Sequence, residues 1–250
     1  MDPAHLLMSA ITRNRYLDSI QKSTVINAVR AFNCVFSVAD ASRFGAVLSN
    51  LQALSWRGTQ TQLVTLAIAY LHGNIQMIPL NNREIQWFYF KGHRWHRLHN
   101  GHMFRFFFLG LSCLLDEVTS AETSPSLQLD LGIANAVVSG MASILSVIAP
   151  GFASLLDSKL DLICFENGVY DMTRKVFRVG RPDDFITRST GYDYIKNHHD
   201  VEAVKLFIHS LFNCDDLYDY VIKIFARALH GKQINKLFVF FGLGTNGKSS

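Results

Sequence analysis

The feature that most constrains the fold is a glycine-rich loop near the C-terminal end of the sequence, directly after five apolar residues. The run Leu237-Phe238-Val239-Phe240-Phe241 has the length and composition of a buried parallel strand. The loop that follows, residues 242–249, fits the pattern G-x-x-x-x-G-K-[ST]. A strand that runs into such a loop is typical of a nucleotide-binding α/β domain. We therefore predict that residues 232–250 are the start of an ATPase-type domain.

Each residue type in this loop has a role in holding a nucleotide. Glycines let the backbone curl so that successive N–H groups face phosphate oxygens, while Lys248 would neutralise the β and γ phosphates and Ser249 would ligate Mg²⁺. The predicted cofactors are therefore ATP and Mg²⁺. The predicted nucleotide-binding residues are Gly242, Gly244, Thr245, Asn246, Gly247, Lys248 and Ser249. The alternative is a glycine-rich turn that matches by accident, and the preceding strand argues against it.

Composition limits the class of protein. Of the 250 residues, 49% are apolar, which is enough for a core, and the net charge of +4 permits contact with nucleic acid without requiring it. The 4 cysteines form no C-x-x-C pair, and no signal-peptide pattern opens the sequence. We expect an intracellular, cytoplasmic protein with reduced thiols.

The uncharged stretch 131–149 is long enough to be considered as a membrane span. Polar residues recur along it at helical spacing, among them Asn135, Ser139 and Ser143, while Val137 and Ile144 are assigned to the opposite face. No basic cluster or aromatic belt flanks it. The pattern favours a buried amphipathic helix and no membrane contact, and a membrane-attached protein is the alternative.

The remaining periodicities predict an α+β fold, mainly helical with small β-hairpins. Helices are expected from Ala4 to Leu71, with breaks near residues 40–42 and Gly58, and residues 72–82 are expected to form a loop. A hairpin is expected over residues 86–97, turning at Lys91-Gly92, and a second β element over residues 161–179. The other predicted helices are 103–115, 131–149, 201–213 and 217–229.

Three groups of residues invite functional interpretations. The hairpin mixes Trp87, Tyr89 and Trp95 with basic residues, which would suit base stacking, but alternate strand positions more often bury such rings, so we favour a structural role. Histidines recur at positions 93, 96, 99 and 102, yet a strand would point them in different directions, so a locally basic surface is favoured over a metal site. Acidic residues at positions 215, 216 and 219 complement a helix dipole, which is favoured over metal binding.

Several blocks resemble, in order, the poxvirus- and phage-type primase-helicases, whose helicase half belongs to superfamily 3 within the AAA+ ATPases. The most specific blocks are the loop 242–249, with Asn246 before Gly247-Lys248, and the strand-turn segment Leu162 to Asp171. Residues 181–188 and the helical segment 207–231 are also similar to that family. The resemblance covers roughly the last two thirds of the chain.

The resemblance implies an ATP-dependent DNA helicase of viral or phage replication that works with other replication proteins as an oligomeric ring, a hexamer in the pattern of the family. It implies a collar or DNA-facing domain at residues 81–231 and the first strand and P-loop of an AAA+ domain at 232–250, which leaves residues 1–80 as a helical N-terminal module predicted from periodicity. The alternative is a non-catalytic collar that binds DNA, replication partners or other copies of itself.

The sequence departs from the family in two respects. It ends at Ser250, before any Walker B acid, sensor or arginine finger. Only about eighty residues precede the family-like part, which is short for a primase domain. For these 250 residues taken alone, we therefore expect neither ATP hydrolysis nor good ATP binding, because the helix that would follow the loop and help to hold the phosphates is missing, and we expect no primase activity.

Overall fold

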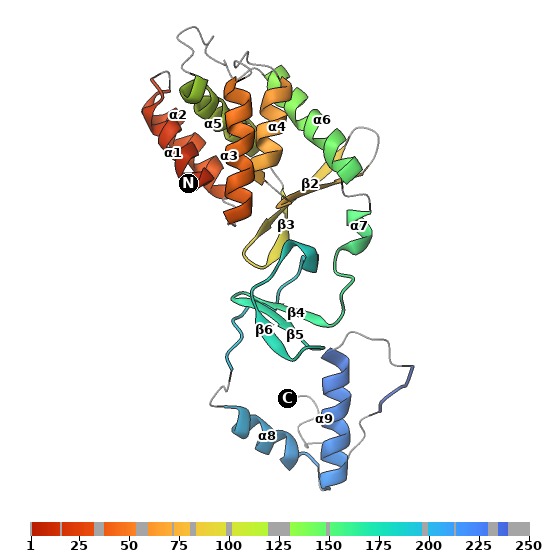
Figure 1. The fold of residues 1–250 in the computed structure, drawn as a ribbon. Coiled ribbons are helices and arrows are strands. Elements are labelled where there is room, and N and C mark those ends of the chain that lie inside the picture. The colour runs from red at the N-terminus through yellow and green to blue at the C-terminus, as the bar shows by residue number, and fades with distance from the viewer. Residues whose placement is uncertain are drawn as a thin grey trace.

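The structure is a computed structural model, and Figure 1 shows its helices and sheets in chain order from red to blue. Helices α1 to α6 gather at one end, two small sheets follow, and helices α8 and α9 lie beyond the second sheet (Figure 1). The residues that the structure describes are 2–15, 17–32, 38–53, 60–71, 73–80, 84–98, 102–119, 131–148, 151–196, 200–212, 214–229 and 235–239.

Six helices build the first part of the chain, as the periodicity predicts, and local capping explains where the first two begin. Asp2 accepts a hydrogen bond from the Ala4 amide at 3.1 Å, and Asp18 forms a capping box with Gln21. The break predicted near residues 40–42 is wrong, because Asp40 lies in a first helical turn, where its charge suits the dipole. The helices are α1 (Pro3–Arg13), α2 (Ser19–Ala31), α3 (Val38–Ala53), α4 (Gln60–Leu71), α5 (His102–Thr119) and α6 (Leu131–Ile148).

Helix α5 is the centre of the helical core. Phe107 and Leu111 on this helix are fully buried. A Cβ added at Gly110 would lie 3.2 Å from side-chain carbons of Ile11 and Val29, so the glycine lets α5 approach α1 and α2 closely. The hydrophobic cluster around α5 extends from Leu7 to Leu145, and it therefore joins residues on both sides of the boundary predicted at residue 80.

Helix α6 is the uncharged stretch whose length would suit a membrane span. Val137, Met141 and Leu145 form its buried row, and Ser139 lies on the exposed side, as predicted. Ile144 is 40% exposed, so its assignment to the core face is wrong, because the buried row is centred nearer Met141 and Leu145. Among the helices that the structure describes, none combines the length and apolar character needed to span a bilayer.

The first sheet contains the predicted hairpin and one further strand. Strands β1 (Ile75–Pro79), β2 (Ile85–Lys91) and β3 (Arg94–Leu98) pair antiparallel in that order. Gly92 has φ +65° in the turn between β2 and β3, where glycine is favoured. The sequence reading placed β1 in a loop, and this was wrong because pairing with β2, rather than local propensity, makes these residues a strand.

A second sheet lies where the β element over residues 161–179 was predicted, and a short helix precedes it. Helix α7 (Phe152–Leu155) leads to strands β4 (Leu162–Phe165), β5 (Gly168–Asp171) and β6 (Val176–Arg178), which also pair antiparallel in chain order. The 3₁₀ turn η1 (Pro182–Asp184) comes next. The core on one face of this sheet is small, consisting of Cys164, Val169 and Ile186 with Leu162 against it.

Helices α8 (Val201–Ser210) and α9 (Asp215–Leu229) confirm the helices predicted in this region. Residues 235–239, which include the described part of the predicted strand, 237–239, form no regular structure, and Leu237 and Val239 are exposed. The strand prediction is therefore not met in these residues. A buried parallel strand needs neighbouring strands on which to pair, and none lies beside 235–239 among the described residues.

Candidate functional site

The predicted nucleotide-binding loop, Gly242 to Ser249, lies outside the described residues. The roles assigned to Lys248 and Ser249, and the binding of ATP and Mg²⁺, stay predictions. The functional features that the structure does place lie on and around the second sheet.

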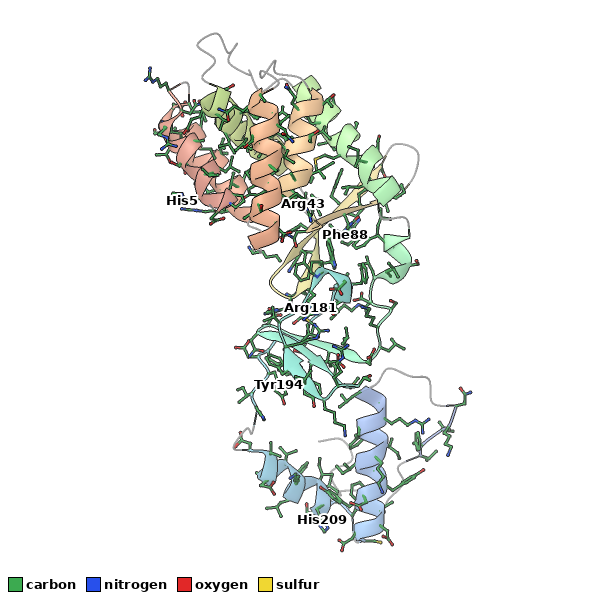
Figure 2. The ribbon with its side chains drawn as sticks, in the orientation of Figure 1. His5, Arg43, Phe88, Arg181, Tyr194 and His209 are labelled. Carbon is green, nitrogen blue, oxygen red and sulfur yellow. The ribbon has the colours of Figure 1, made fainter. Side chains whose placement is uncertain are left out.

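The aromatic residues of the β2–β3 hairpin are structural. Trp87 packs edge-on against Phe104 of α5, and Trp95 packs against Phe152 of α7. Both tryptophans are buried, and the hairpin therefore joins the helices on one face to α7 on the other. In Figure 2, Phe88 lies at this junction. The two tryptophans are therefore not available to bases, whereas Tyr89 is partly buried and stacks on His96.

Two members of the histidine series, His93 and His96, have described side chains, whereas His99 and the side chain of His102 lie outside the described part of the structure. His96 stacks on Tyr89, with ring centroids 5.4 Å apart, and burial with the nearby Arg94 charge lowers the pKa of its imidazole. His93 instead accepts a hydrogen bond at Nδ1 from the Gly180 amide. Among the described residues, no group of three His, Cys, Asp or Glu side chains could hold a metal ion. Asp215 lies in the first turn of α9, as the dipole argument predicts, and contacts His209 at 2.8 Å.

The strand-turn segment 162–171 holds two aromatic residues at the second sheet in place, one by close packing at a glycine and one by hydrogen bonds with an asparagine side chain. A Cβ added at Gly168 would lie 2.5 Å from the Phe177 ring and 2.8 Å from the Arg178 carbonyl oxygen, so only glycine leaves room for that ring. The Asn167 side chain accepts a hydrogen bond from the Tyr194 amide at 2.9 Å and donates one to the Tyr194 carbonyl at 3.1 Å. The turn Asn167-Gly168 thereby fixes the positions of Phe177 and Tyr194.

These contacts assemble an aromatic face on one side of β4–β6. Phe177 and Tyr194 stack with centroids 4.7 Å apart, and Phe165 packs edge-on against Tyr192 and Tyr194. Tyr170 completes the group at 5.4 Å from Tyr194. Figure 2 shows Tyr194 on the side of this sheet that faces away from helices α1 to α6. We call Phe165, Tyr170, Phe177, Tyr192 and Tyr194 the aromatic face.

The sequence reading missed this face. Two local signals were present: one aromatic residue in each of the three strands, and the repeat Tyr192-Asp193-Tyr194. What joins them is long-range, because the amide of Glu166 donates to the Tyr192 carbonyl and the amide of Thr190 donates to the Cys164 carbonyl. The segment that carries the two tyrosines therefore runs along the edge of β4 and protects it.

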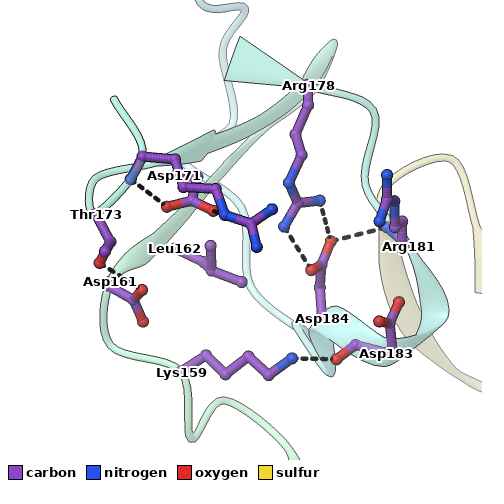
Figure 3. A pocket seen from close by; sticks show the side chains of 10 residues that line it. Lys159, Asp161, Leu162, Asp171, Thr173, Arg178, Arg181, Asp183 and Asp184 are labelled. Atoms are coloured by element: carbon purple, nitrogen blue, oxygen red, sulfur yellow. Dashed lines mark hydrogen bonds and ion pairs between the residues drawn. The ribbon is translucent and has the colours of Figure 1, made fainter. Parts of the chain in front are cut away.

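The opposite side of the sheet carries a polar pocket of about 320 Å³, seen from close by in Figure 3. Its centre is the ion pair of Arg178 with Asp184, in which both guanidinium nitrogens donate at 2.7 Å. Asp184 also accepts from the Arg181 amide at 2.8 Å. Burial raises the pKa of Asp184, but the bonds from Arg178 and the Arg181 amide outweigh it, so the pKa lies below the usual value. The same hydrogen bonds to Asp184 raise the pKa of Arg178.

The pocket is electrostatically balanced rather than a strong binding site. Lys159 donates to the Asp183 carbonyl, Arg174 pairs loosely with Asp171 at 3.9 Å, and Arg178 binds Asp184 through Nη1 and Nη2 while its buried Nε has no hydrogen-bond partner. Since its cations and acids largely serve one another, the arrangement stabilises the loop from β6 to η1. We therefore regard this side of the sheet as structural.

Besides a weak contact of the Cys164 thiol with the His93 carbonyl, four polar contacts hold the first sheet to the second sheet and to the segment that follows it. Trp95 donates from its amide to the Ile186 carbonyl at 2.7 Å and from its indole to the Pro182 carbonyl at 2.8 Å. Arg94 pairs with Glu166 at 2.7 Å, and hydrogen bonds from Ser189 and then Arg94 lower the pKa of this carboxyl. The fourth contact is the bond from Gly180 to His93 at 3.1 Å. These contacts fix the sheet that carries the aromatic face relative to the first sheet.

Comparison with known proteins supports a family assignment. The family model described as "D5 N terminal like" matches residues 67–216, which is more than half of the chain. "Putative helicase L207/L206" of Acanthamoeba polyphaga mimivirus is 36% identical over 104 residues, 40% of this chain and 11% of that protein. "Putative helicase 184R" of Invertebrate iridescent virus 6 is 32% identical over 99 residues, 38% of this chain and 10% of that protein.

The chain thus spans about a tenth of the length of the curated relatives that it matches. The matched family region contains both sheets, the polar pocket and the aromatic face. The chain belongs to the D5 N terminal like family of viral primase-helicases, the family that its motifs resemble.

Proposed function

We propose that this chain is part of an ATP-dependent DNA helicase of superfamily 3 that acts in viral DNA replication. The observation that carries the proposal is the sequence Gly242-Leu243-Gly244-Thr245-Asn246-Gly247-Lys248-Ser249, in a chain whose family relatives are named as helicases. In this proposal the loop amides and Lys248 hold the phosphates of ATP, and Ser249 ligates Mg²⁺.

Residues 67–216 would then be a domain that precedes the ATPase domain and works beside it. Two observations favour this role beside the ATPase domain: the family match and the polar contacts that link the two sheets. A homo-oligomeric ring, DNA as substrate and contact with replication proteins belong to the same proposal. They are consistent with the names of the relatives, which describe those proteins as helicases.

The test is ATP hydrolysis by the protein that carries this sequence together with a complete ATPase domain. We expect turnover that single-stranded DNA stimulates, and loss of that turnover in Lys248→Ala, because the charge opposite the β and γ phosphates is removed. Arg227→Ala, which removes an exposed cation from α9, is the control and should retain turnover. Equal turnover in Lys248→Ala and the unmodified protein would refute the proposal.

A further inference from the structure

The aromatic face is open in the described part of the chain. No described helix makes an extensive contact with β4–β6, and the small core of this sheet lies on its other side. Tyr192 is 63% exposed, and its ring stands at 69° to Phe165. Tyr170, Phe177 and Tyr194 are only partly buried. Tyr192 is thus an exposed ring that rests on partly buried aromatic neighbours.

The rings are also held in place before any ligand arrives. Asn167 fixes the backbone of Tyr194 from both sides, and Gly168 leaves the space that the Phe177 ring fills. A surface whose side chains are already positioned loses little conformational entropy when it binds a flat ligand. The arrangement therefore suits stacking better than a set of mobile surface tyrosines would.

Lysine residues lie close in sequence to two of these rings, beside one exposed acid, Asp193. Lys175 precedes Phe177 by two residues and Lys196 follows Tyr194 by two, and both lysines are exposed. In the described residues neither lysine forms an ion pair with an acid. Arg188 is likewise exposed and forms no such pair there. These cations are free to meet an anionic backbone that passes beside the rings.

We infer that the aromatic face binds single-stranded DNA, with a base stacked on Tyr192 and the phosphates near Lys175 and Lys196. Stacked rings beside unpaired cations are the combination by which proteins hold single strands without reading their sequence. Duplex DNA does not fit this chemistry, since the faces of its bases are covered by their neighbours. The choice of DNA as the nucleic acid rests on the proposed function, whereas the stacking surface rests on the geometry.

The test measures binding of a fluorescent oligo-dT strand to the 250-residue chain by anisotropy at low salt, without ATP. Tyr192→Ala should weaken binding about tenfold, which corresponds to ~1.4 kcal/mol, because one stacked base is lost. Tyr192→Phe should bind as the unmodified chain does, since the ring remains. Tyr220→Ala removes a tyrosine from α9 that is 51% exposed, and this matched control should leave affinity unchanged.

The charges provide a second readout. Lys175→Ala and Lys196→Ala should each reduce the slope of log K against log salt by about 0.7, the value for one phosphate contact on a single strand. An oligo-dT duplexed with oligo-dA should compete poorly with the labelled strand.

Three results would overturn the inference. The first is no binding of oligo-dT by the unmodified chain, and the second is equal affinity in Tyr192→Ala and Tyr220→Ala. The third is self-association of the chain that Tyr192→Ala abolishes while DNA affinity is unchanged, which would make the face an interface between copies. Each of these leaves the ATP hydrolysis test of the proposed function standing, because that test depends on Lys248.

Discussion

Arg178→Ala should destabilise the chain strongly, because it leaves a buried carboxylate without its cation. Only 4% of the Asp184 side chain is exposed, and Arg178 supplies two of its three hydrogen bonds. Removing one partner of a buried ion pair costs about 3–5 kcal/mol. In a chain of this size, 1 kcal/mol shifts the melting temperature by roughly 2–4 °C, so we expect a decrease of roughly 10 °C.

The assay is a thermal melt followed by tryptophan fluorescence at pH 7. Trp95 is a suitable reporter because its indole N–H donates to the Pro182 carbonyl, in the same 3₁₀ turn as Asp184. Arg174→Ala is the control, since the Arg174 side chain is 74% exposed and lies 3.9 Å from Asp171, a loose ion pair worth about 0–1 kcal/mol, and the buried Asp171 keeps its hydrogen bond from the Arg174 backbone amide. Equal melting temperatures of Arg178→Ala and Arg174→Ala would refute the reasoning.

The pH dependence gives an independent check with a defined sign. In the unmodified chain the pKa of Asp184 is lowered, so the pair contributes stability above the usual carboxyl pKa of about 3.9 and loses it as the pH falls further. In Arg178→Ala, burial is left as the main influence and should raise the pKa of Asp184 above the usual value. The difference in melting temperature should therefore be largest near pH 7 and shrink towards pH 4.

Trp95→Ala should cost about 3–5 kcal/mol in urea unfolding, because it removes a buried ring and the indole hydrogen bond, whereas Arg94→Ala at the rim of the junction should cost far less. Gly180→Ala should destabilise by more than 1 kcal/mol, since its Cβ would lie 2.6 Å from the carbonyl oxygen of His93, and a melting temperature equal to that of the unmodified chain would contradict this. Burial raises the pKa of the Cys113 thiol to about 12, so mass spectrometry should find Cys113 unlabelled by iodoacetamide at pH 8 until the chain is unfolded.

Elements with strong local periodicity could be predicted from the sequence, and elements defined by pairing could not. Helices α5 and α6 and the hairpin turn at Gly92 were predicted because apolar spacing and turn residues lie within a few positions of one another. Strand β1 was missed because its residues become a strand only through pairing with β2. Ile144 was placed on the wrong side of α6, since the neighbours of a helix decide where its buried row is centred.

The same division applies to the candidate site. The segment from Glu166 to Asp171 was recognised as informative, but its contacts with Tyr194 and Phe177 connect residues that are separated in the sequence. No local pattern shows that Asn167 clamps Tyr194. Conversely, the tryptophans of the hairpin are mixed with basic residues, a pattern that suits a nucleic-acid-binding surface. The structure buries these tryptophans because they lie between two packed layers.

The bond from the Trp95 amide to the Ile186 carbonyl has a consequence for hydrogen exchange. This amide belongs to β3, yet its acceptor belongs to the segment after η1, so fraying of the hairpin ends does not release it. Exchange with solvent deuterium requires the second sheet to separate from the hairpin or the whole region to unfold. The exchange rate of this single amide thus measures how often the two sheets come apart, and a nucleotide or DNA strand that alters this rate would be acting across the junction.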